Sequence, residues 1–446
     1  MFKNCLSFAS NFIVATVFLT ASLSRGQTFE LLKSFQGSDG AQPYAGLIQA
    51  SNGVFYGTTF SGGTSNLGTV FQITTSGALT PLVSFTGTNG VNPIAGLLQG
   101  SDGNLYGTTT SGGSSNLGSI FRLNTNGALT SLVAFNNANG ESPVTALSQT
   151  TDGVLYGSTY FGGASGFGTL FKATTNGVLT TLFSFNSTNG SNPSGELKSD
   201  GTGAFYGTTV HGGSSLPHGT VFKFLTNGAF TTLSSFNGTN GSEPGAELLF
   251  RTNGVFYGTT RLGGASNAGT VFQITTNGAM TTLLSFNGAN GRYPSSGLIL
   301  LGGEMYGTTY FGGTNDLGTV FKVTTNGTLT TLLSFNNTNG AHPYAHLLLA
   351  NDGNLYGTTW EGGTNGLGTV FRLITSVAVS LNVRSSGSNI ILSWNTNATG
   401  FTLQSATNLV FPINWSNVTN QPAVVGGQFV VTNNASASAV FYRLKK

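Results

Sequence analysis

The sequence has little charge and almost no cysteine. Only 7% of its 446 residues are Asp, Glu, Lys or Arg, and the one cysteine is Cys5, close to the start of the chain. A single thiol can form no disulfide within the chain and supplies no Cys-pair motif for zinc or redox chemistry. The 16 basic residues are dispersed, whereas nucleic acids need a clustered basic face. The composition therefore argues against a nucleic-acid partner.

Long hydrophobic runs are also lacking after the first 26 residues. Those 26 residues carry Lys3, an apolar stretch over residues 12–19 and then small residues. This pattern predicts a secretory signal peptide, cut after Gly26. An uncleaved anchor helix is the alternative, although the apolar stretch is shorter than the ~20 residues of a membrane span. Cleavage would remove Cys5, Lys3 and Arg25, which leaves 14 basic against 13 acidic residues in a protein that we expect to be secreted or at the cell surface.

Glycine and aromatic residues are abundant, and they recur with a fixed period. The motif Tyr-Gly-Thr/Ser-Thr occurs seven times at spacings of 49 to 51 residues, with its tyrosines at Tyr56, Tyr106, Tyr156, Tyr206, Tyr257, Tyr306 and Tyr356. A period of this length indicates a solenoid, a propeller or another array. One repeat is rich in Val, Leu, Phe, Tyr and Thr over residues 45–50, 54–60, 68–75 and 78–85. These segments predict four strands.

Glycine marks the turns between the predicted strands. Asn-Gly pairs such as Asn126-Gly127 separate the third and fourth strands, and this pair predicts a tight hairpin in which both residues have positive φ. All seven turns between the first and second strands contain Gly, but only three have Asp before it. The turn position therefore requires a backbone geometry rather than a charge for calcium.

The two ends of the repeat region complement each other. The last repeat stops after its third strand, which starts near Gly368, while residues 28–35 read as a fourth strand without the three before it. Seven complete sheets follow only if the N-terminal strand closes a ring. We predict an all-β fold: a seven-bladed β-propeller over residues 27–376, closed by the N-terminal strand. The tail, residues 377–446, has alternating strands with Trp394 and Trp415 and predicts a small β-sandwich.

The repeat unit, YGTTxxGG followed by GTVF, resembles the GloVer tandem repeat of secreted bacterial proteins. The match extends over residues 28–375, nearly all of the predicted mature chain. This resemblance implies export and a propeller-like fold, and it implies no established activity. The tail, with "IILSWNT" at residues 390–396, is similar to the fibronectin type III-like C-terminal modules of bacterial secreted proteins.

The repeats differ most in the loop that follows the YGTT or YGST motif. Four of the seven residues directly after the motif are aromatic, and aromatic rings beside polar groups suit sugar faces or a protein partner. We predict a binding face at Phe60, Tyr160, His211, Arg261, Tyr310, Trp360 and Glu361. Packing between neighbouring loops is the alternative. The expected partners are a polysaccharide or a cell-surface protein, and the expected role is a binding, adhesion or structural module; a spacer that displays the tail is a further possibility.

Ionisable groups give a weaker signal. Glu196, Glu247, Glu304 and Glu361 are interpreted as occupying different repeat positions, which does not favour a catalytic pair. The alternative function is a carbohydrate-active hydrolase or lyase that uses Glu361, with Asp316 as its only candidate partner. His342 and His346 are four residues apart, but Pro343 lies between them and an extended chain would separate them. The sequence predicts no metal site and no cofactor.

Overall fold

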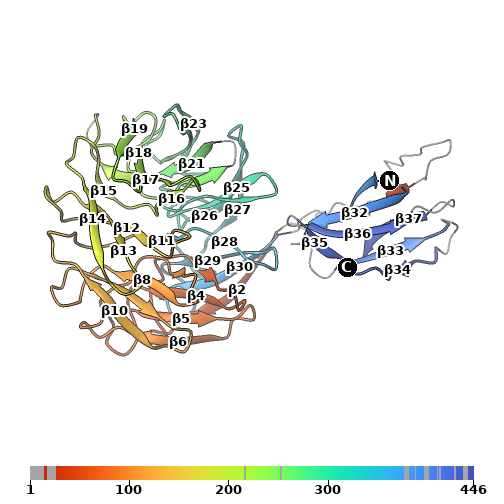
Figure 1. Cartoon of the computed structure of the whole chain (residues 1–446), viewed down its shortest axis with the longest axis horizontal. Coiled ribbons are helices and arrows are strands. Elements are labelled where there is room, and N and C mark those ends of the chain that lie inside the picture. The colour runs from red at the N-terminus through yellow and green to blue at the C-terminus, as the bar shows by residue number, and fades with distance from the viewer. Residues whose placement is uncertain are drawn as a thin grey trace. The chain divides into compact units, whose positions relative to one another are not determined.

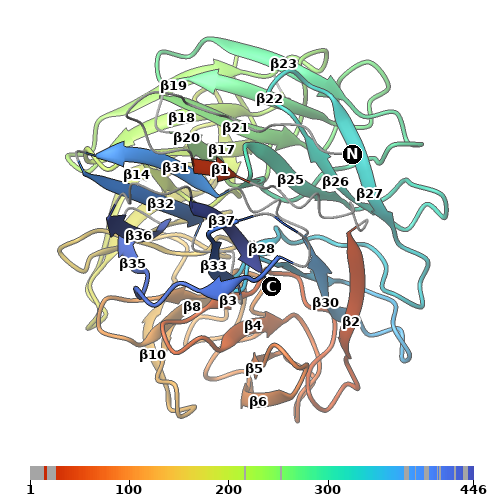
Figure 2. The same cartoon turned by 90° about the vertical axis from the view of Figure 1, so that its right-hand side faces the viewer.

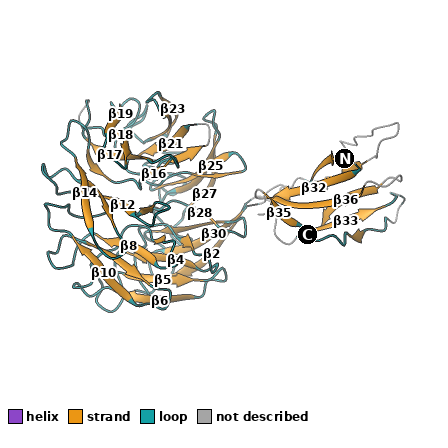
Figure 3. Cartoon of the chain, viewed as in Figure 1, coloured by secondary structure: helices purple, strands orange, loops and turns teal. Residues whose placement is uncertain are grey.

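The computed structural model of the protein describes residues 15–17, 27–214, 217–251, 254–375, 381–386, 388–395, 401–408, 410, 413–425, 428–434 and 440–445. All regular elements in these residues are β-strands (Figure 3). No helix of this part is long and apolar enough to cross a bilayer. The all-β prediction is confirmed.

The seven repeats build seven separate sheets in the described part of the chain (Figure 1). Within the repeats, strands that follow one another in sequence pair antiparallel. The first three sheets contain β3 (Ile48–Gln49), β4 (Phe55–Thr59), β5 (Thr69–Ile73) and β6 (Leu79–Ser84); β7 (Leu98–Gln99), β8 (Leu105–Thr109), β9 (Ser119–Leu123) and β10 (Leu129–Ala134); and β11 (Ser148–Gln149), β12 (Leu155–Thr159), β13 (Thr169–Ala173) and β14 (Leu179–Ser184).

The fourth repeat adds one strand to this pattern, because β15 and β16 both pair with a longer β17. The fourth to sixth sheets contain β15 (Ser191–Pro193), β16 (Lys198–Ser199), β17 (Ala204–His211), β18 (Thr220–Leu225) and β19 (Phe230–Ser235); β20 (Leu249–Arg251), β21 (Val255–Thr260), β22 (Thr270–Thr275) and β23 (Met280–Ser285); and β24 (Ile299–Leu301), β25 (Glu304–Thr309), β26 (Thr319–Val323) and β27 (Leu329–Ser334).

The seventh sheet joins the two ends of the repeat region. It consists of β28 (Leu348–Leu349), β29 (Leu355–Thr359), β30 (Thr369–Ile374) and the N-terminal strand β2 (Thr28–Ser34). Figure 2 shows β2 beside β30. The Phe35 backbone N–H donates to the Gly368 carbonyl at 3.1 Å, and Arg372 forms an ion pair with Glu30. The pairing of the first repeat-region strand with the last repeat agrees with the sequence argument.

The predicted strands were longer than the real ones, and the predicted turn geometry was wrong in one respect. The first strand of each repeat shrinks to two or three residues, as in β3. In the described Asn-Gly turns only the glycine has positive φ, for example 94° at Gly177. The Asn side chain instead accepts a hydrogen bond, as Asn176 does from Thr174. The turn is therefore a longer loop that ends in a left-handed glycine, and not a two-residue hairpin.

The hydrophobic core lies between neighbouring sheets. All five residues of β4 are buried, and one cluster joins Tyr56 and Phe85 of the first repeat to Leu105 and Phe121 of the second. Strands buried on both faces read as nearly continuous apolar runs, as the third strands do. The first Thr of the YGTT motif also links neighbours, because Thr58 Oγ1 donates to the carbonyl of Ala95 in the next repeat at 3.1 Å. This arrangement of four-stranded sheets is propeller-like.

The tail forms two further sheets within a second compact unit of the chain. One sheet contains β31 (Asn382–Ser386), β32 (Asn389–Asn395), β36 (Gln428–Asn434) and β35 (Ala423–Val425), and the other contains β1 (Ala15–Val17), β37 (Val440–Lys445), β33 (Thr402–Ala406) and β34 (Ser416–Asn417). Trp394, Leu403 and Tyr442 share one core cluster that draws on both sheets. The predicted domain boundary falls in residues 376–380, and most of the predicted signal peptide falls in residues 1–14 and 18–26; both lie outside the described residues.

Candidate functional site

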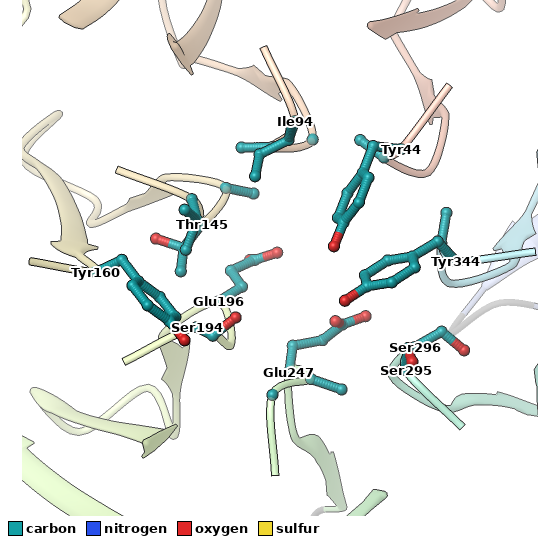
Figure 4. A pocket seen from close by; sticks show the side chains of 18 of the residues that line it. Tyr44, Ile94, Thr145, Tyr160, Ser194, Glu196, Glu247, Ser295, Ser296 and Tyr344 are labelled. Atoms are coloured by element: carbon teal, nitrogen blue, oxygen red, sulfur yellow. The ribbon is translucent and has the colours of Figure 1, made fainter. Parts of the chain in front are cut away.

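A cavity of about 640 Å³ opens where the first strands of the repeats begin (Figure 4). Residues from all seven repeats line it. They come chiefly from the three positions that follow a proline in each repeat, such as Tyr44, Ala45 and Gly46 after Pro43. We call these the first, second and third lining positions.

The residue before each of these prolines is left-handed. Its φ lies between 52° and 60° at Gln42, Asn92, Ser142, Asn192, Glu243, Tyr293 and His342. Positive φ is unfavourable for residues other than glycine, so surrounding contacts must hold it. Asn92 Nδ2 donates to the Phe60 carbonyl at 2.7 Å, and Asn192 Nδ2 donates to the Tyr160 carbonyl at 3.0 Å. These contacts fix the chain direction immediately before the lining residues.

The first lining position divides the cavity wall into an apolar arc and a polar arc. Repeats 1 to 3 place Tyr44, Ile94 and Val144 there, whereas repeats 4 to 6 place Ser194, Gly245 and Ser295. Repeat 7 returns to an aromatic residue, Tyr344, whose ring centroid lies 3.9 Å from that of Tyr44. At this position, therefore, repeats 1 to 3 and 7 supply large apolar or aromatic side chains, and repeats 4 to 6 supply small ones, two of them with hydroxyl groups (Figure 4).

The third lining position also differs between the repeats, here in the presence of ionisable side chains. It is Gly46, Gly96 and Ala146 in repeats 1 to 3, but Glu196, Glu247 and His346 in repeats 4, 5 and 7. We call the last three the Glu–Glu–His cluster. His346 Nδ1 lies 3.0 Å from Glu247 Oε1. The interpretation that Glu196 and Glu247 occupy different repeat positions was wrong, because both are the third residue after the proline in adjacent repeats.

Glycine clears the space that this cluster occupies. Gly297 is the third residue after the proline in repeat 6, and a Cβ added to it would lie 2.2 Å from the Glu247 carboxylate. A Cβ added to Gly46 would lie 2.9 Å from His346 Nε2. Neither glycine has a positive φ, so their backbones do not require glycine. The missing side chains let Glu247 and His346 meet across the repeat that separates them.

The three members of the cluster have different electrostatic surroundings. Burial raises the pKa of Glu196, and the Glu247 carboxylate raises it further, against the attraction of Lys198 and His346. Burial also opposes the charge on Glu247, but His346 outweighs it and the pKa of Glu247 is lowered. The two carboxylates in turn raise the pKa of His346 above its ordinary value, against burial. Two glutamates at one repeat position are thereby driven toward opposite protonation states.

Three of the predicted binding residues, Tyr160, His211 and Arg261, lie in the cavity wall. The Arg261 guanidinium donates to Glu243 Oε2 at 2.8 Å, so this charge is already paired. Beside Tyr160, Phe161 also lines the cavity and is 45% exposed.

The remaining predicted aromatic residues contact each other and the wall. The ring centroid of Trp360 lies 5.2 Å from that of Tyr44 and 5.4 Å from that of Phe60. Tyr310 stacks on His342 at 4.8 Å and meets Tyr344 edge-on at 5.7 Å. These rings pack against the first lining residues Tyr44 and Tyr344 and remain partly exposed. The contacts agree with loop packing, and the binding role stays a prediction.

Glu361 and Asp316 have other partners. Glu361 Oε2 lies 3.8 Å from His342 Nε2, and its side chain is about half exposed. Asp316 accepts two hydrogen bonds from the Arg292 guanidinium, at 3.1 and 2.6 Å. Arg292 also lowers the pKa of Asp316. A carboxylate held in this way by arginine is a poor proton donor.

The family model described as "Gloeobacter/Verrucomicrobia repeat" matches residues 9–216 and 194–408. The chain belongs to this family. The match agrees with the resemblance found in the repeated motif. No curated protein matches the sequence.

Several solved structures are similar to this member of the Gloeobacter/Verrucomicrobia repeat family at low identity. A gluconolactonase from Xanthomonas campestris is 13% identical, with a TM-score of 0.41, over 80% of this chain and 93% of that one. A candidate 6-phosphogluconolactonase from Bacteroides uniformis is 16% identical, with a TM-score of 0.45, over 90% and 99%. A puromycin-hydrolyzing peptidase from Mycobacterium tuberculosis is 12% identical, with a TM-score of 0.47, over 81% and 60%. Similarity of this degree assigns no activity to the repeat protein.

Sequence reasoning found Tyr160, His211 and Arg261 of this repeat protein but missed the lining positions after the prolines, because it searched for binding residues in the loops after the YGTT motif. The signal was nevertheless present. Aligning the repeats on their prolines shows that the third lining position is Gly or Ala in four repeats and ionisable in three. In the described residues, no group of three or more His, Cys, Asp or Glu side chains is arranged to hold a metal ion.

Proposed function

We propose that the protein is an exported seven-bladed β-propeller, closed by its own N-terminal strand, that binds a polysaccharide in its cavity. Closure is supported by contacts between the ends of the repeat region. Thr358 Oγ1 donates to the Ala45 carbonyl at 3.1 Å, which repeats the bond between Thr58 and Ala95 across a separation of 313 residues. A ring brings all seven lining segments to one cavity.

The division of the cavity wall is the observation that carries the binding proposal. A pyranose ring has an apolar face of C–H groups and a polar edge of hydroxyl groups. Tyr44, Ile94 and Val144 can pack against the face, while Ser194, Ser295 and the carboxylates can bond the hydroxyls. Pockets for small molecules combine these features in volumes of about 300–1,000 Å³.

The rim supports a polymer as the ligand rather than a single sugar. Phe161 is exposed beside Tyr160, and Trp360 extends the aromatic surface from Tyr44 toward Phe60. A chain of sugars could occupy the cavity with one unit and lie across these rings with the next. Residues 1–26 serve as the signal peptide in this proposal, so the mature tail keeps β37, β33 and β34 of its second sheet without β1. The tail is then a fibronectin type III-like module at the cell surface.

Calorimetric titration with cellohexaose, xylohexaose, chitohexaose and maltohexaose tests the proposal. We expect one or more of these to bind, and Tyr44→Ala to weaken the binding about tenfold or more, as the loss of an aromatic anchor does. Replacing both Tyr310 and Trp360 by Ala should weaken it as well. Val178→Ala is the control, since Val178 is 61% exposed and does not line the cavity. Unchanged affinity of Tyr44→Ala would show that the cavity is not the site.

A further inference from the structure

We propose that Glu196 and Glu247 form the acid–base pair of a glycoside-hydrolysing centre in this cavity, an inference that rests on the saccharide binding proposed above. Both side chains point into the cavity from adjacent repeats (Figure 4). Glycoside hydrolysis needs two carboxyl groups that flank the glycosidic bond, one protonated and one ionised. The predicted pair, Glu361 and Asp316, is less suitable, because Arg292 holds Asp316 ionised and neither residue lines the cavity.

The surroundings of each glutamate assign its role. Glu196 is half-buried, and burial together with the Glu247 charge raises its pKa, so it can carry the proton. Glu247 keeps its negative charge because His346 hydrogen-bonds it at 3.0 Å. His346 does not need to touch the sugar and is therefore a positioning residue. Two neighbouring carboxyl groups with pKa values driven apart are the usual arrangement of an acid and a base.

The reaction consumes one water molecule. Glu196 gives its proton to the glycosidic oxygen, and the bond from that oxygen to the anomeric carbon breaks with its electron pair left on oxygen. The water oxygen forms the new bond to the anomeric carbon, and Glu247 takes the proton that the water loses. The products are two shorter saccharides, with Glu196 ionised and Glu247 protonated. Proton exchange with solvent restores both carboxyl groups.

The cavity provides room and orientation for this step. Gly46, Gly96 and Ala146 leave the opposite side without bulk, so a sugar can approach the carboxyl groups while its apolar face meets Ile94 and Tyr44. Other charges near the pair are Lys198, which acts on Glu196, Glu247 and His346, and the paired Arg261 and Glu243 of the wall.

Release of new reducing ends from the four hexasaccharides, followed from about pH 3 to about pH 9, tests the proposal. We expect the rate to rise as Glu247 ionises and to fall as Glu196 ionises. Glu196→Gln and Glu247→Gln should each lower the rate about 100-fold or more while still binding the same hexasaccharide. Glu304→Gln should leave the rate unchanged, because Glu304 pairs with Lys322 and does not line the cavity. His346→Gln should move the acid limb of the profile to higher pH, because Glu247 loses its partner. The basic limb should also move to higher pH, because His346 lowers the pKa of Glu196.

The outcomes separate this inference from the binding proposal. Wild-type protein that binds a hexasaccharide but releases no reducing ends would overturn the catalytic centre and leave the binding function standing. Hydrolysis that survives Glu196→Gln would assign the chemistry elsewhere. Absence of both binding and release would refute both proposals. As an independent measurement, carbon-detected NMR titration should find the Glu196 carboxyl above its ordinary pKa and the Glu247 carboxyl below it, and the reverse order would contradict the assigned roles.

Discussion

Two of the regions of the repeat domain that carry charged residues follow different rules. On the sheets, the third strand carries a residue directly opposite the YGTT tyrosine, such as Arg122 opposite Tyr106. In the cavity, the Glu–Glu–His cluster occupies a position that is Gly or Ala in the other four repeats. We call the first group, together with the acid of the adjoining turn, the outer charge pairs.

The outer charge pairs are matched repeat by repeat. Repeats 2, 3, 4, 6 and 7 have an acid in or beside the turn and a base on the third strand, as in Asp102 with Arg122 and Glu304 with Lys322. Repeats 1 and 5 have neither, since Gln72 and Gln273 stand in the place of the base and Asn52 and Asn253 in that of the acid. The acid and the base are therefore either both present or both replaced in a given repeat, as expected when the two residues stabilise the sheet as a pair.

The cavity cluster shows no such matching. Glu196 and Glu247 have no basic residue at the same position of their own neighbours, and His346 reaches Glu247 only across Gly297. Charges that recur in step with a repeat stabilise the repeat, whereas charges that interrupt it at a lining position point to a ligand or to chemistry. The comparison therefore separates framework from site within one chain.

Removing the strand that joins the ends would destroy both regions at once and is the largest expected effect. Deletion of residues 28–35 takes β2 from β30 and exposes the edge of the seventh sheet. We expect a loss comparable to the ~5–15 kcal/mol that holds a domain folded, seen as a lost cooperative transition in thermal unfolding followed by circular dichroism.

Two single variants serve as the control for the deletion. Phe35 and Phe85 are both fully buried and pack edge-on against Phe71 and Phe121 of the third strands. Truncation to Ala should cost each about 3–5 kcal/mol. A cooperative transition at the wild-type temperature in the deletion variant would show that β2 closes nothing.

A methyl group at Gly297 would break the cavity cluster without touching the framework. Its Cβ would lie 2.2 Å from the Glu247 carboxylate, so Gly297→Ala should push that flexible side chain away from His346. We expect about a tenfold loss of hexasaccharide affinity, or about 1.4 kcal/mol, with little change in melting temperature. Calorimetry and thermal unfolding on the same sample measure both quantities.

Gly96→Ala is the matched control for that variant. Gly96 is also a third lining residue, but a Cβ there would lie 3.6 Å from the Ala146 Cβ, an ordinary contact. We expect its affinity to stay within about twofold of wild type. Equal losses in both variants would mean that cavity volume, and not the position of Glu247, governs binding.

Much of the framework could be predicted from the sequence because one short pattern is repeated seven times. Turn glycines such as Gly53, with a φ of 81°, and the apolar third strands predict the same sheet in every repeat. The additional strand at residues 28–35 predicts its partner, β30. The Asn-Gly turns were mispredicted because the Asn side chain accepts a hydrogen bond from a threonine hydroxyl, as Asn176 does from Thr174, and propensity alone cannot distinguish this from a left-handed Asn.

The cavity was harder to predict because its walls are short segments that repeat least strictly. A left-handed residue before a proline is rare. The residue types around His342 and Glu243 do not predict the φ of 56° that both adopt. The contact of His346 with Glu247 depends on an absent side chain at Gly297. Aligning the repeats by sequence could have found the Glu–Glu–His positions. The contact between Glu247 and His346 is seen only in the folded structure.

Neutralising an outer charge pair should have the smallest effect of these changes, and it tests directly whether the charges on the sheets differ in role from those in the cavity. Lys322 Nζ lies 2.8 Å from Glu304 Oε2, and the two side chains are 27% and 33% exposed. Water screens such a pair, so it contributes roughly 0–1 kcal/mol.

The double variant Glu304→Gln with Lys322→Gln reproduces the uncharged pairing of repeats 1 and 5. We expect its unfolding free energy to change by less than about 1 kcal/mol in urea titration, with hexasaccharide affinity unchanged. A marked loss of affinity from this exchange would place the ligand on the sheets rather than in the cavity, and the distinction between framework charges and site charges would no longer hold.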